Sequence, residues 1–281
     1  MRFFHVDAFT DAAFGGNPAA VCLLDGPAGP SWMGLVAAEV NLPMTAFLEH
    51  RDGGYRVRWF TPAAAEVVLC GHATLASAHV LVEAGLARRD EPIRFDSASG
   101  PLVARRDGDM ITLDFPARPA TAAPVPPGLL TALGVSRPAW TGRAPEDFLV
   151  VLDSEAGVTG LQPDLAGLTA VDTRGVIVTA PAASRPGTDF VSRFFAPAIG
   201  VPEDPVTGSA HCTLAQYWGE RLERPTLTGY QASARGGTVR VHWDGDRVTL
   251  AGQAVTVASG TLASPALPDP AAGELPLSTR S

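Results

Sequence analysis

The sequence predicts an α+β protein of two pseudo-symmetric lobes, each with a sheet curled around a central helix. Residues 58–62 (RWFTP) recur as residues 193–197 (RFFAP), and residues 72–76 (HATLA) recur as residues 211–215 (HCTLA). The separations of 135 and 139 residues are close to half of the 281-residue chain. They indicate a duplicated unit with a four-residue insertion in the second copy.

The second observation is a pair of matching apolar helices. Residues 71–84 are apolar on nearly every side, and Gly85 is a typical helix stop. A helix that is apolar all round is buried on all sides, as it is when a sheet curls around it. The corresponding helix of the second half runs from about Thr207 to Trp218. Both halves are therefore expected to have one buried central helix.

The remaining elements of the first half follow from local patterns. Alternating or short apolar runs predict strands, and apolar residues at helical spacing predict a helix that ends before Pro43. We expect strands at 2–6, 20–24, 45–48, 55–60 and 67–70, a helix at 31–40 and a loop at 41–45.

A proline-rich segment separates the two halves. Five of the thirteen residues from 116 to 128 are proline, which is typical of an extended linker. We therefore place an N-terminal lobe at 1–118 and a C-terminal lobe at 119–281, with a mobile tail at 263–281. The second lobe is expected to contain strands at 190–195, 239–242, 247–250 and 254–257.

Composition limits the chemistry and the partners. The chain has no lysine, which excludes a lysine Schiff base, a pyridoxal phosphate anchor and the lysine of a phosphate-binding loop. The net charge of -8 argues against a nucleic-acid partner. No window approaches the roughly 18 apolar residues of a membrane span, and Cys22, Cys70 and Cys212 have no metal-like or disulfide-like spacing. We expect a cytoplasmic protein that uses neither a metal nor a cofactor.

Catalytic groups are expected where the two buried helices begin. A helix N-terminus presents unpaired N–H groups and a partial positive charge, which bind a carboxylate or stabilise an enolate-like anion. Each lobe would contribute one such turn to a cleft between them. The first turn offers Cys70, Gly71 and His72, and the second offers Asp204, Thr207, Gly208 and Ser209. A carboxylate with an imidazole suits proton transfer, although a helix cap and a buried structural histidine are the alternatives.

Six motifs occur in order along the chain. They are 17–21 (NPAAV), 58–62 (RWFTP), 69–76 (LCGHATLA), 203–211 (EDPVTGSAH), 231–237 (QASARGG) and 252–257 (GQAVTV). Together they resemble the PhzF-like family of phenazine-biosynthesis isomerases, over about residues 1–262. The resemblance implies the diaminopimelate-epimerase fold with mostly antiparallel sheets, a cofactor-independent site between the lobes and a homodimer.

The resemblance also implies roles for single residues. His72 and Asp204 correspond to catalytic residues, Ser209 to a substrate contact, and Gly71 and Gly208 to donors of backbone amides. Further candidate substrate contacts are Asn17, Met44, Thr207 and Arg235, the last of which could equally be a surface arginine before a strand.

One residue departs from the family pattern. The family's usual loop reads Asn-Leu-Ser-Glu-Thr, with the glutamate as general acid/base, whereas this chain has Met44 at that position. Methionine carries no exchangeable proton, and a positioned acid/base typically supplies ~10²–10⁴-fold of rate. The phenazine-type isomerisation is therefore not expected.

Three hypotheses fit this substitution, and we favour the first. In it, a cofactor-independent isomerase, epimerase or tautomerase shuttles the proton through Cys70, ionised by the helix dipole, and Asp204. In the second, Asp204 and His72 alone isomerise a small unsaturated or amino-acid-like carboxylate, as relatives do in antibiotic biosynthesis, and Met44 lines an apolar pocket. In the third, the protein binds its ligand without turnover. Glu66 is a weaker candidate for a second acid.

Overall fold

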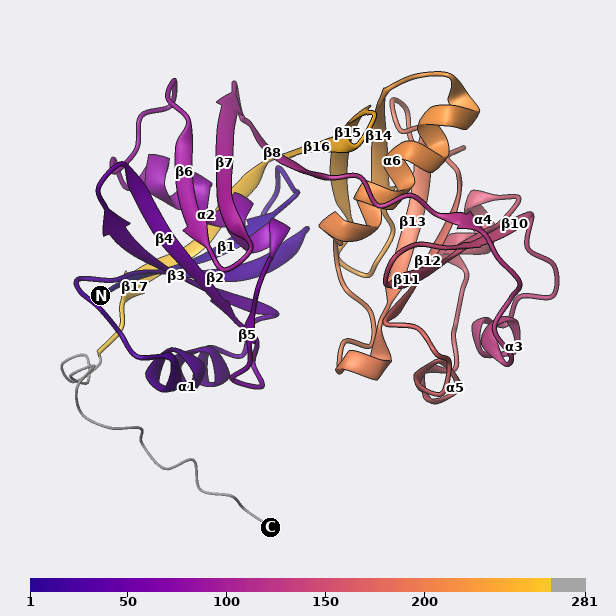
Figure 1. Ribbon diagram of the computed structural model, residues 1–281, viewed down its shortest axis with the longest axis horizontal. Helices are drawn as coiled ribbons and strands as arrows, with labels where there is room; N and C mark the ends of the chain where they lie inside the picture. The colour runs from indigo at the N-terminus through magenta and orange to yellow at the C-terminus, as the bar shows by residue number, and fades with distance from the viewer. Residues whose placement is uncertain (264–281) are drawn as a thin grey trace, which may run out of the picture. The chain divides into compact units, whose positions relative to one another are not determined.

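The computed structural model describes residues 1–263 and divides the chain into two compact units (Figure 1). Among the described residues, unit 1 contains residues 1–8, 18–111 and 254–263. Unit 2 contains residues 9–17 and 112–253. The mobile tail predicted at 263–281 lies, apart from its first residue, outside the described residues.

The sheet of unit 1 mixes parallel and antiparallel pairs. Its strands lie in the order β17 (Ala254–Thr261), β1 (Arg2–Ala8), β2 (Asn17–Leu23), β3 (Met44–Arg51), β4 (Gly54–Phe60), β6 (Ile93–Ser97) and β7 (Gly100–Asp107). The pairs β2–β3 and β4–β6 are parallel, and the pairs β1–β17, β3–β4 and β6–β7 are antiparallel. The short β5 (Glu66–Val67) pairs with the end of β4.

Helix α2 (Gly71–Glu83) is the central helix of unit 1. Nine of its thirteen residues are buried, and it packs against β1, β3, β7 and β17, so the sheet wraps around it (Figure 1). Helix α1 (Pro30–Val40) covers the other face of the sheet, where Met33 and Ala37 pack with Phe47 and Phe60. The nearly all-round apolar pattern of α2 fits this burial, which leaves Glu83 as the exposed residue of the helix.

The strands of unit 2 also form both parallel and antiparallel pairs. Its strands lie in the order β9 (Thr121–Ala122), β10 (Trp140–Arg143), β11 (Asp147–Val151), β12 (Gly175–Pro181), β13 (Phe190–Phe195), β14 (Thr226–Gln231), β15 (Gly237–Asp244), β16 (Arg247–Gly252) and β8 (Met110–Pro116). Helix α6 (Gly208–Leu222) packs against β14, β15 and β16. The short helices α3 (Leu129–Leu133), α4 (Glu155–Thr159) and α5 (Leu165–Thr169) share a core with β11, β12 and β13. The α+β prediction is confirmed.

The strand pairings confirm the duplication. The pairs β2–β3, β3–β4, β4–β6 and β6–β7 are parallel, antiparallel, parallel and antiparallel, and β11–β12, β12–β13, β13–β14 and β14–β15 repeat that alternation. The registers match as well, since Ala19 pairs with Met44 and Asp147 pairs with Gly175. Thr45, which follows Met44, pairs with Phe60, and Val176, which follows Gly175, pairs with Phe195. Phe60 and Phe195 are each the third residue of the RWFTP-type motif. Met44 and Gly175 therefore occupy corresponding positions.

The central helices align differently from the repeat in the sequence. The N-caps are Cys70 and Thr207, which are 137 residues apart, so the predicted separation of 139 was wrong by two residues. The fourth residue after each N-cap supports this alignment. Thr74 Oγ1 donates to the Cys70 carbonyl at 2.6 Å, and His211 Nδ1 lies 2.8 Å from the Thr207 carbonyl. His211 corresponds to Thr74 and not to His72.

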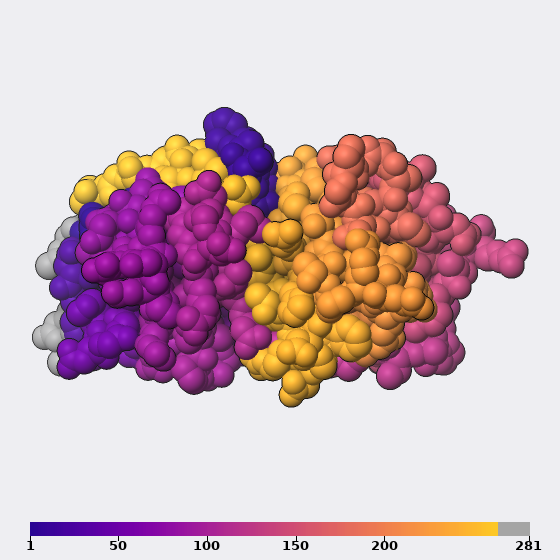
Figure 2. Space-filling view, turned by 90° about the horizontal axis from the view of Figure 1, so that it is seen from above, coloured from indigo at the N-terminus to yellow at the C-terminus, as the bar shows by residue number. Residues whose placement is uncertain are grey.

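Other predicted boundaries also need correction. Strand β17 pairs with β1 in unit 1 and does not close the second lobe, and Figure 2 shows its yellow surface beside indigo N-terminal residues. The predicted strand at 67–70 is reduced to Glu66–Val67, because Cys70 already caps α2. Unit 1 passes into unit 2 after residue 111, before the proline-rich segment. None of the helices within residues 1–263 is long and apolar enough to cross a membrane.

Candidate active site

Asp204 lies in the loop that leads into helix α6, and both of its carboxylate oxygens have a donor. Asn17 Nδ2 donates to Asp204 Oδ1 at 2.8 Å, and Thr207 Oγ1 donates to Asp204 Oδ2 at 2.6 Å. Asn17 Nδ2 also donates to the Val206 carbonyl at 2.8 Å. Asn17 is fully buried, so the structure gives this predicted substrate contact a role in orienting Asp204.

Gln231, at the end of β14, forms hydrogen bonds with the backbone of the loop that carries Asp204. Its Oε1 accepts from the backbone N–H of Thr207 at 2.8 Å, and its Nε2 donates to the Asp204 carbonyl at 2.6 Å. Ser233 Oγ donates to the Pro205 carbonyl at 2.8 Å. The loop is thus held on both sides before any ligand binds, which keeps the carboxylate in a fixed position for proton transfer.

The surroundings of Asp204 suit acid/base chemistry near neutral pH. Burial raises the pKa of Asp204 to about 6, although the hydrogen bonds from Thr207 and Asn17 and the charge of Arg174 act in the opposite direction. A carboxyl group with this pKa is populated in both protonation states near neutrality. It can therefore accept a proton from a ligand and return it.

An ion pair lies at the start of α6, and neither of its members was predicted. Arg174 Nε donates to Asp147 Oδ1 at 2.8 Å, and Arg174 Nη2 donates to Asp147 Oδ2 at 2.5 Å. Arg174 Nη2 also donates to Ser209 Oγ at 3.1 Å. Asp147 is only 1% exposed. Arg174 therefore links the first residue of β11 to the first turn of α6.

At the start of α2, a thiol and an imidazole are in contact. Cys70 Sγ lies 3.5 Å from His72 Nδ1, and both side chains are buried. Burial lowers the pKa of His72 to about 4. The imidazole is therefore neutral at pH 7, and its lowered pKa makes it a weaker base than an ordinary histidine. The helix alignment makes Ser209 the counterpart of His72.

Both central helices leave their first backbone N–H groups open to an anion. Neither N-cap forms a side-chain cap hydrogen bond, and neither first turn contains an acidic residue. In α6 the reason is visible, since the Thr207 hydroxyl donates to Asp204 instead of accepting from the helix. Gly71 and Gly208 are the first helical residues, so no side chain covers these turns at that point. Such helix ends attract carboxylates and enolate-like anions.

Met44 and Arg235 have surroundings of very different kinds. Met44 is the first residue of β3 and is 9% exposed, beside Ala19 on the neighbouring strand. Arg235 Nε donates to the Gly16 carbonyl at 2.9 Å, and its Nη2 donates to the Gly15 carbonyl at 2.8 Å. These bonds tie the turn of Arg235 to the segment that carries Asn17. They favour a structural role for Arg235 over direct substrate binding.

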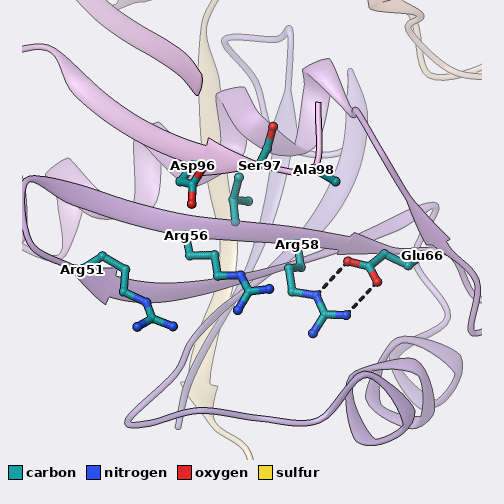
Figure 3. Close-up of a pocket in the computed structure, with 8 residues that line it drawn as sticks. Arg51, Arg56, Arg58, Glu66, Asp96, Ser97 and Ala98 are labelled. Atoms are coloured by element: carbon teal, nitrogen blue, oxygen red, sulfur yellow. Dashed lines mark hydrogen bonds and ion pairs between the residues drawn. The ribbon is translucent and has the colours of Figure 1, made fainter. Parts of the chain in front are cut away.

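Glu66 is engaged in an ion pair away from the helix starts. Arg58 Nε and Nη2 each donate to it at 2.7 Å, and these bonds hold the pKa of Glu66 below its usual value, so a second acid here is not supported. The pair lines a cavity of about 480 Å³ on the strands β3, β4 and β6, together with Arg51, Arg56 and Asp96 (Figure 3). Of the candidate residues, Glu66 lines this cavity, whereas those at the starts of α2 and α6 do not. Within residues 1–263, no group of three or more His, Cys, Asp or Glu side chains is placed to hold a metal ion.

The sequence motifs did not indicate Arg174, Asp147 or the pairing role of Gln231. Asp147 is the first residue of one apolar strand, and Arg174 directly precedes another. Because these strands are parallel neighbours, both residues lie at the same edge of the sheet. The sequence did contain one signal for this pair, which is the opposite charges of two residues at the starts of two successive apolar strands.

Comparisons with known proteins agree over nearly the whole chain. The sequence profile of the PhzC-PhzF family, described as phenazine biosynthesis-like protein, matches residues 6–260. A protein of Halalkalibacterium halodurans named an uncharacterized isomerase is 50% identical over 253 residues, covering 90% of this chain and 94% of that protein. The crystal structure of a PhzF-family phenazine biosynthesis protein from Enterococcus faecalis has 41% identity and a TM-score of 0.87, covering 92% and 97%. A predicted epimerase from Pseudomonas aeruginosa shares the fold, with 20% identity and a TM-score of 0.75 over 94% and 99% of the chains.

Proposed function

The chain belongs to the PhzF-like family of phenazine biosynthesis-like proteins, and we propose that it is a cofactor-independent isomerase of a small carboxylate-bearing molecule. The observation that carries the proposal is Asp204, which is held by Asn17 and Thr207 and has a pKa raised to about 6 by burial. Such a group transfers protons efficiently near neutral pH. The isomerase names of the relatives support the reaction class.

Asp204 is proposed to take a proton from a carbon next to the substrate carboxylate or double bond. The C–H electron pair moves into the unsaturated system, which leaves an enolate-like anion on the substrate and a neutral Asp204. Return of that proton to the same carbon or to a conjugated one gives the isomer, without net oxidation or reduction. The N–H groups of Gly208 and Ser209 lie at the positive end of α6, where the transient anion is stabilised.

We extend the proposal to Cys70 and His72 as a second proton carrier. The thiol lies 3.5 Å from the neutral imidazole and carries a proton of its own, whereas the lowered pKa of His72 makes the imidazole a poor acceptor of that proton. A thiol gives the chain a proton donor that Met44 does not supply. If Asp204 and His72 act alone, Cys70 is a structural N-cap and its loss leaves proton transfer in place. The substrate would belong to secondary metabolism, as the family resemblance implies.

A second candidate function is ligand binding without turnover, which Met44 favours. By the resemblance of the loop 41–45, this residue stands where the family's usual glutamate would carry the proton. The intact set of donors around Asp204 favours the enzyme, because a binding protein has no need for a carboxyl group poised near neutral pH.

Proton NMR in D₂O with a panel of small unsaturated and α-amino acids tests the proposal. We expect solvent deuterium to enter one carbon-bound position, and Asp204→Asn to abolish this exchange. Asp189→Asn, which removes another paired carboxylate of unit 2, is the control. A further loss in Cys70→Ala supports the thiol shuttle, whereas unchanged exchange supports Asp204 and His72 alone. Saturable binding of a ligand without any exchange would establish the binding protein.

A further inference from the structure

Arg174 is placed to control Ser209, the residue of α6 expected to contact the substrate. A serine hydroxyl has one proton to donate and two lone pairs that accept. Arg174 Nη2 donates into one lone pair of Ser209 Oγ at 3.1 Å. Because the guanidinium has only donors, the Ser209 proton must point away from it. That proton is left for an acceptor such as a carboxylate or an enolate oxygen.

The guanidinium is held in place independently of any ligand. Asp147 binds it with two hydrogen bonds, and Glu146 lies 3.1 Å from Nη1. A Cβ at Gly175 would come within 2.4 Å of Phe194 Cζ and 3.2 Å of Asp147 Oδ1. Because residue 175 is a glycine, the Asp147 carboxylate and the Phe194 ring have space to lie beside Arg174.

The duplicated unit shows that the fold does not require this ion pair. The strand registers equate Gly175 with Met44 and Asp147 with Ala19. The residue before Met44 is Pro43, so the corresponding place in unit 1 has neither charge. Unit 1 nevertheless forms the same alternation of parallel and antiparallel strands. An ion pair that one copy has and the other lacks is better explained by chemistry at α6 than by stability of the sheet.

We propose that Arg174, anchored by Asp147, is a positioning residue that orients the Ser209 hydroxyl as a donor toward the substrate anion. This inference rests on the proposed function, since it assigns the neighbour of Ser209 a part in the same proton-transfer site. It also names the substrate feature that is recognised, which is an anionic oxygen at the start of α6. Arg174 itself acts through Ser209.

Charge on Arg174 has a second, separable effect on Asp204. The charged groups that act on this carboxylate are Arg174, which favours the ionised form, and Glu203, which disfavours it. Asn17 and Thr207 also favour the ionised form through hydrogen bonds. Replacing Arg174 by glutamine should therefore raise the pKa of Asp204, whereas lysine, which keeps the charge, should leave it nearer the wild-type value.

Binding of benzoate, followed by NMR, tests the inference through a double-mutant cycle. We expect Arg174→Gln and Ser209→Ala each to weaken binding about tenfold, and the double variant to be no weaker than Ser209→Ala alone. Arg224→Gln, which removes an ion pair with Asp189 beyond the other end of α6, should bind as the wild type does. Additive losses, or an unchanged affinity in Arg174→Gln, would overturn the positioning role.

Two further measurements separate this inference from misfolding and from failure of the proposed function. Arg174→Gln with Asp147→Asn removes the unpaired buried charge, so it should fold and still bind weakly. If the wild type does not bind benzoate, the ¹³C titration of the Asp204 carboxyl and the backbone amide signal of Ser209 are read instead. Both should move in Arg174→Gln, and Arg174→Lys should restore the Asp204 titration. If neither signal changes in Arg174→Gln, the inference is refuted, even if deuterium exchange establishes the isomerase.

Discussion

The starts of α2 and α6 have the same backbone arrangement and opposite side-chain chemistry. Both helices begin with a glycine, lack a side-chain cap and leave open N–H groups. At α2 the neighbouring groups are a buried thiol and a neutral imidazole. At α6 they are a carboxyl group poised near neutral pH and an arginine that binds Ser209. The two copies therefore share a helix start without a side-chain cap, whereas the charged side chains lie at only one of them, the start of α6.

The largest expected difference between the two helix starts is in proton transfer. Asp204→Asn should lower the deuterium exchange rate by ~10²–10⁴-fold, because the amide cannot act as a base. His72→Gln should have a smaller effect if the thiol remains a proton carrier. Deuterium exchange rates measured by NMR at pH 7 show which of the two variants loses more activity. A greater loss in His72→Gln than in Asp204→Asn would move the catalytic base to unit 1.

The corresponding positions Met44 and Gly175 should respond to alanine for opposite reasons. Met44→Ala leaves a cavity in unit 1 and should lower the free energy of unfolding by about 2 kcal/mol or more. Gly175→Ala adds a Cβ that would meet Phe194 and should cost about 1–3 kcal/mol through overpacking. Urea denaturation measures both changes. A neutral Gly175→Ala would show that the Phe194 ring moves aside.

The pH dependence of stability should have opposite signs at the two helix starts. Burial lowers the pKa of His72 from 6.5 to about 4, so the unfolded chain binds more protons between these values. Stability is therefore lost as pH falls from about 6.5 to 4, by up to about 3 kcal/mol. The pKa of Asp204 is raised from 3.8 to about 6, so the folded state binds more protons and stability is lost as pH rises through this range.

Thermal denaturation between pH 4 and pH 8 checks these two signs. His72→Gln should reduce the loss of stability on the acid side. Asp204→Asn should raise the melting temperature at pH 8 relative to the wild type and have less effect at pH 4. His211, whose pKa is also lowered to about 4 by burial, remains in both variants and contributes the same acid-side loss. Equal effects of Asp204→Asn at both pH values would contradict the raised pKa.

The smallest expected effect is at Arg235. Arg235→Gln removes two hydrogen bonds to the carbonyls of Gly15 and Gly16, so stability should fall by about 1 kcal/mol. Ligand affinity should be nearly unchanged, because those contacts already engage the guanidinium. Isothermal titration with benzoate measures the affinity. A tenfold weaker affinity with unchanged stability would restore the predicted role of Arg235 in substrate binding.

Local patterns in the sequence were enough to predict the repeated architecture. The apolar run after Gly71 and the motif around Gly208 predicted two buried helices, and the RWFTP-type repeat equated β4 with β13. Helix periodicity and strand alternation are properties of neighbouring residues, so they can be recognised without knowing the path of the chain. The offset between the helices was less secure, because the HATLA-type motif matched residues two positions out of register.

The partners of the catalytic candidates were decided by tertiary structure alone. Asn17 and Asp204 are 187 residues apart, and their hydrogen bond exists only because the segment 9–17 is part of unit 2. Arg174 meets Asp147 because two parallel strands begin at the same sheet edge. The sequence by itself determined where the helices begin and which residue types stand there. Burial and long-range pairing then set the protonation and orientation of Asp204, since both depend on groups far away along the chain.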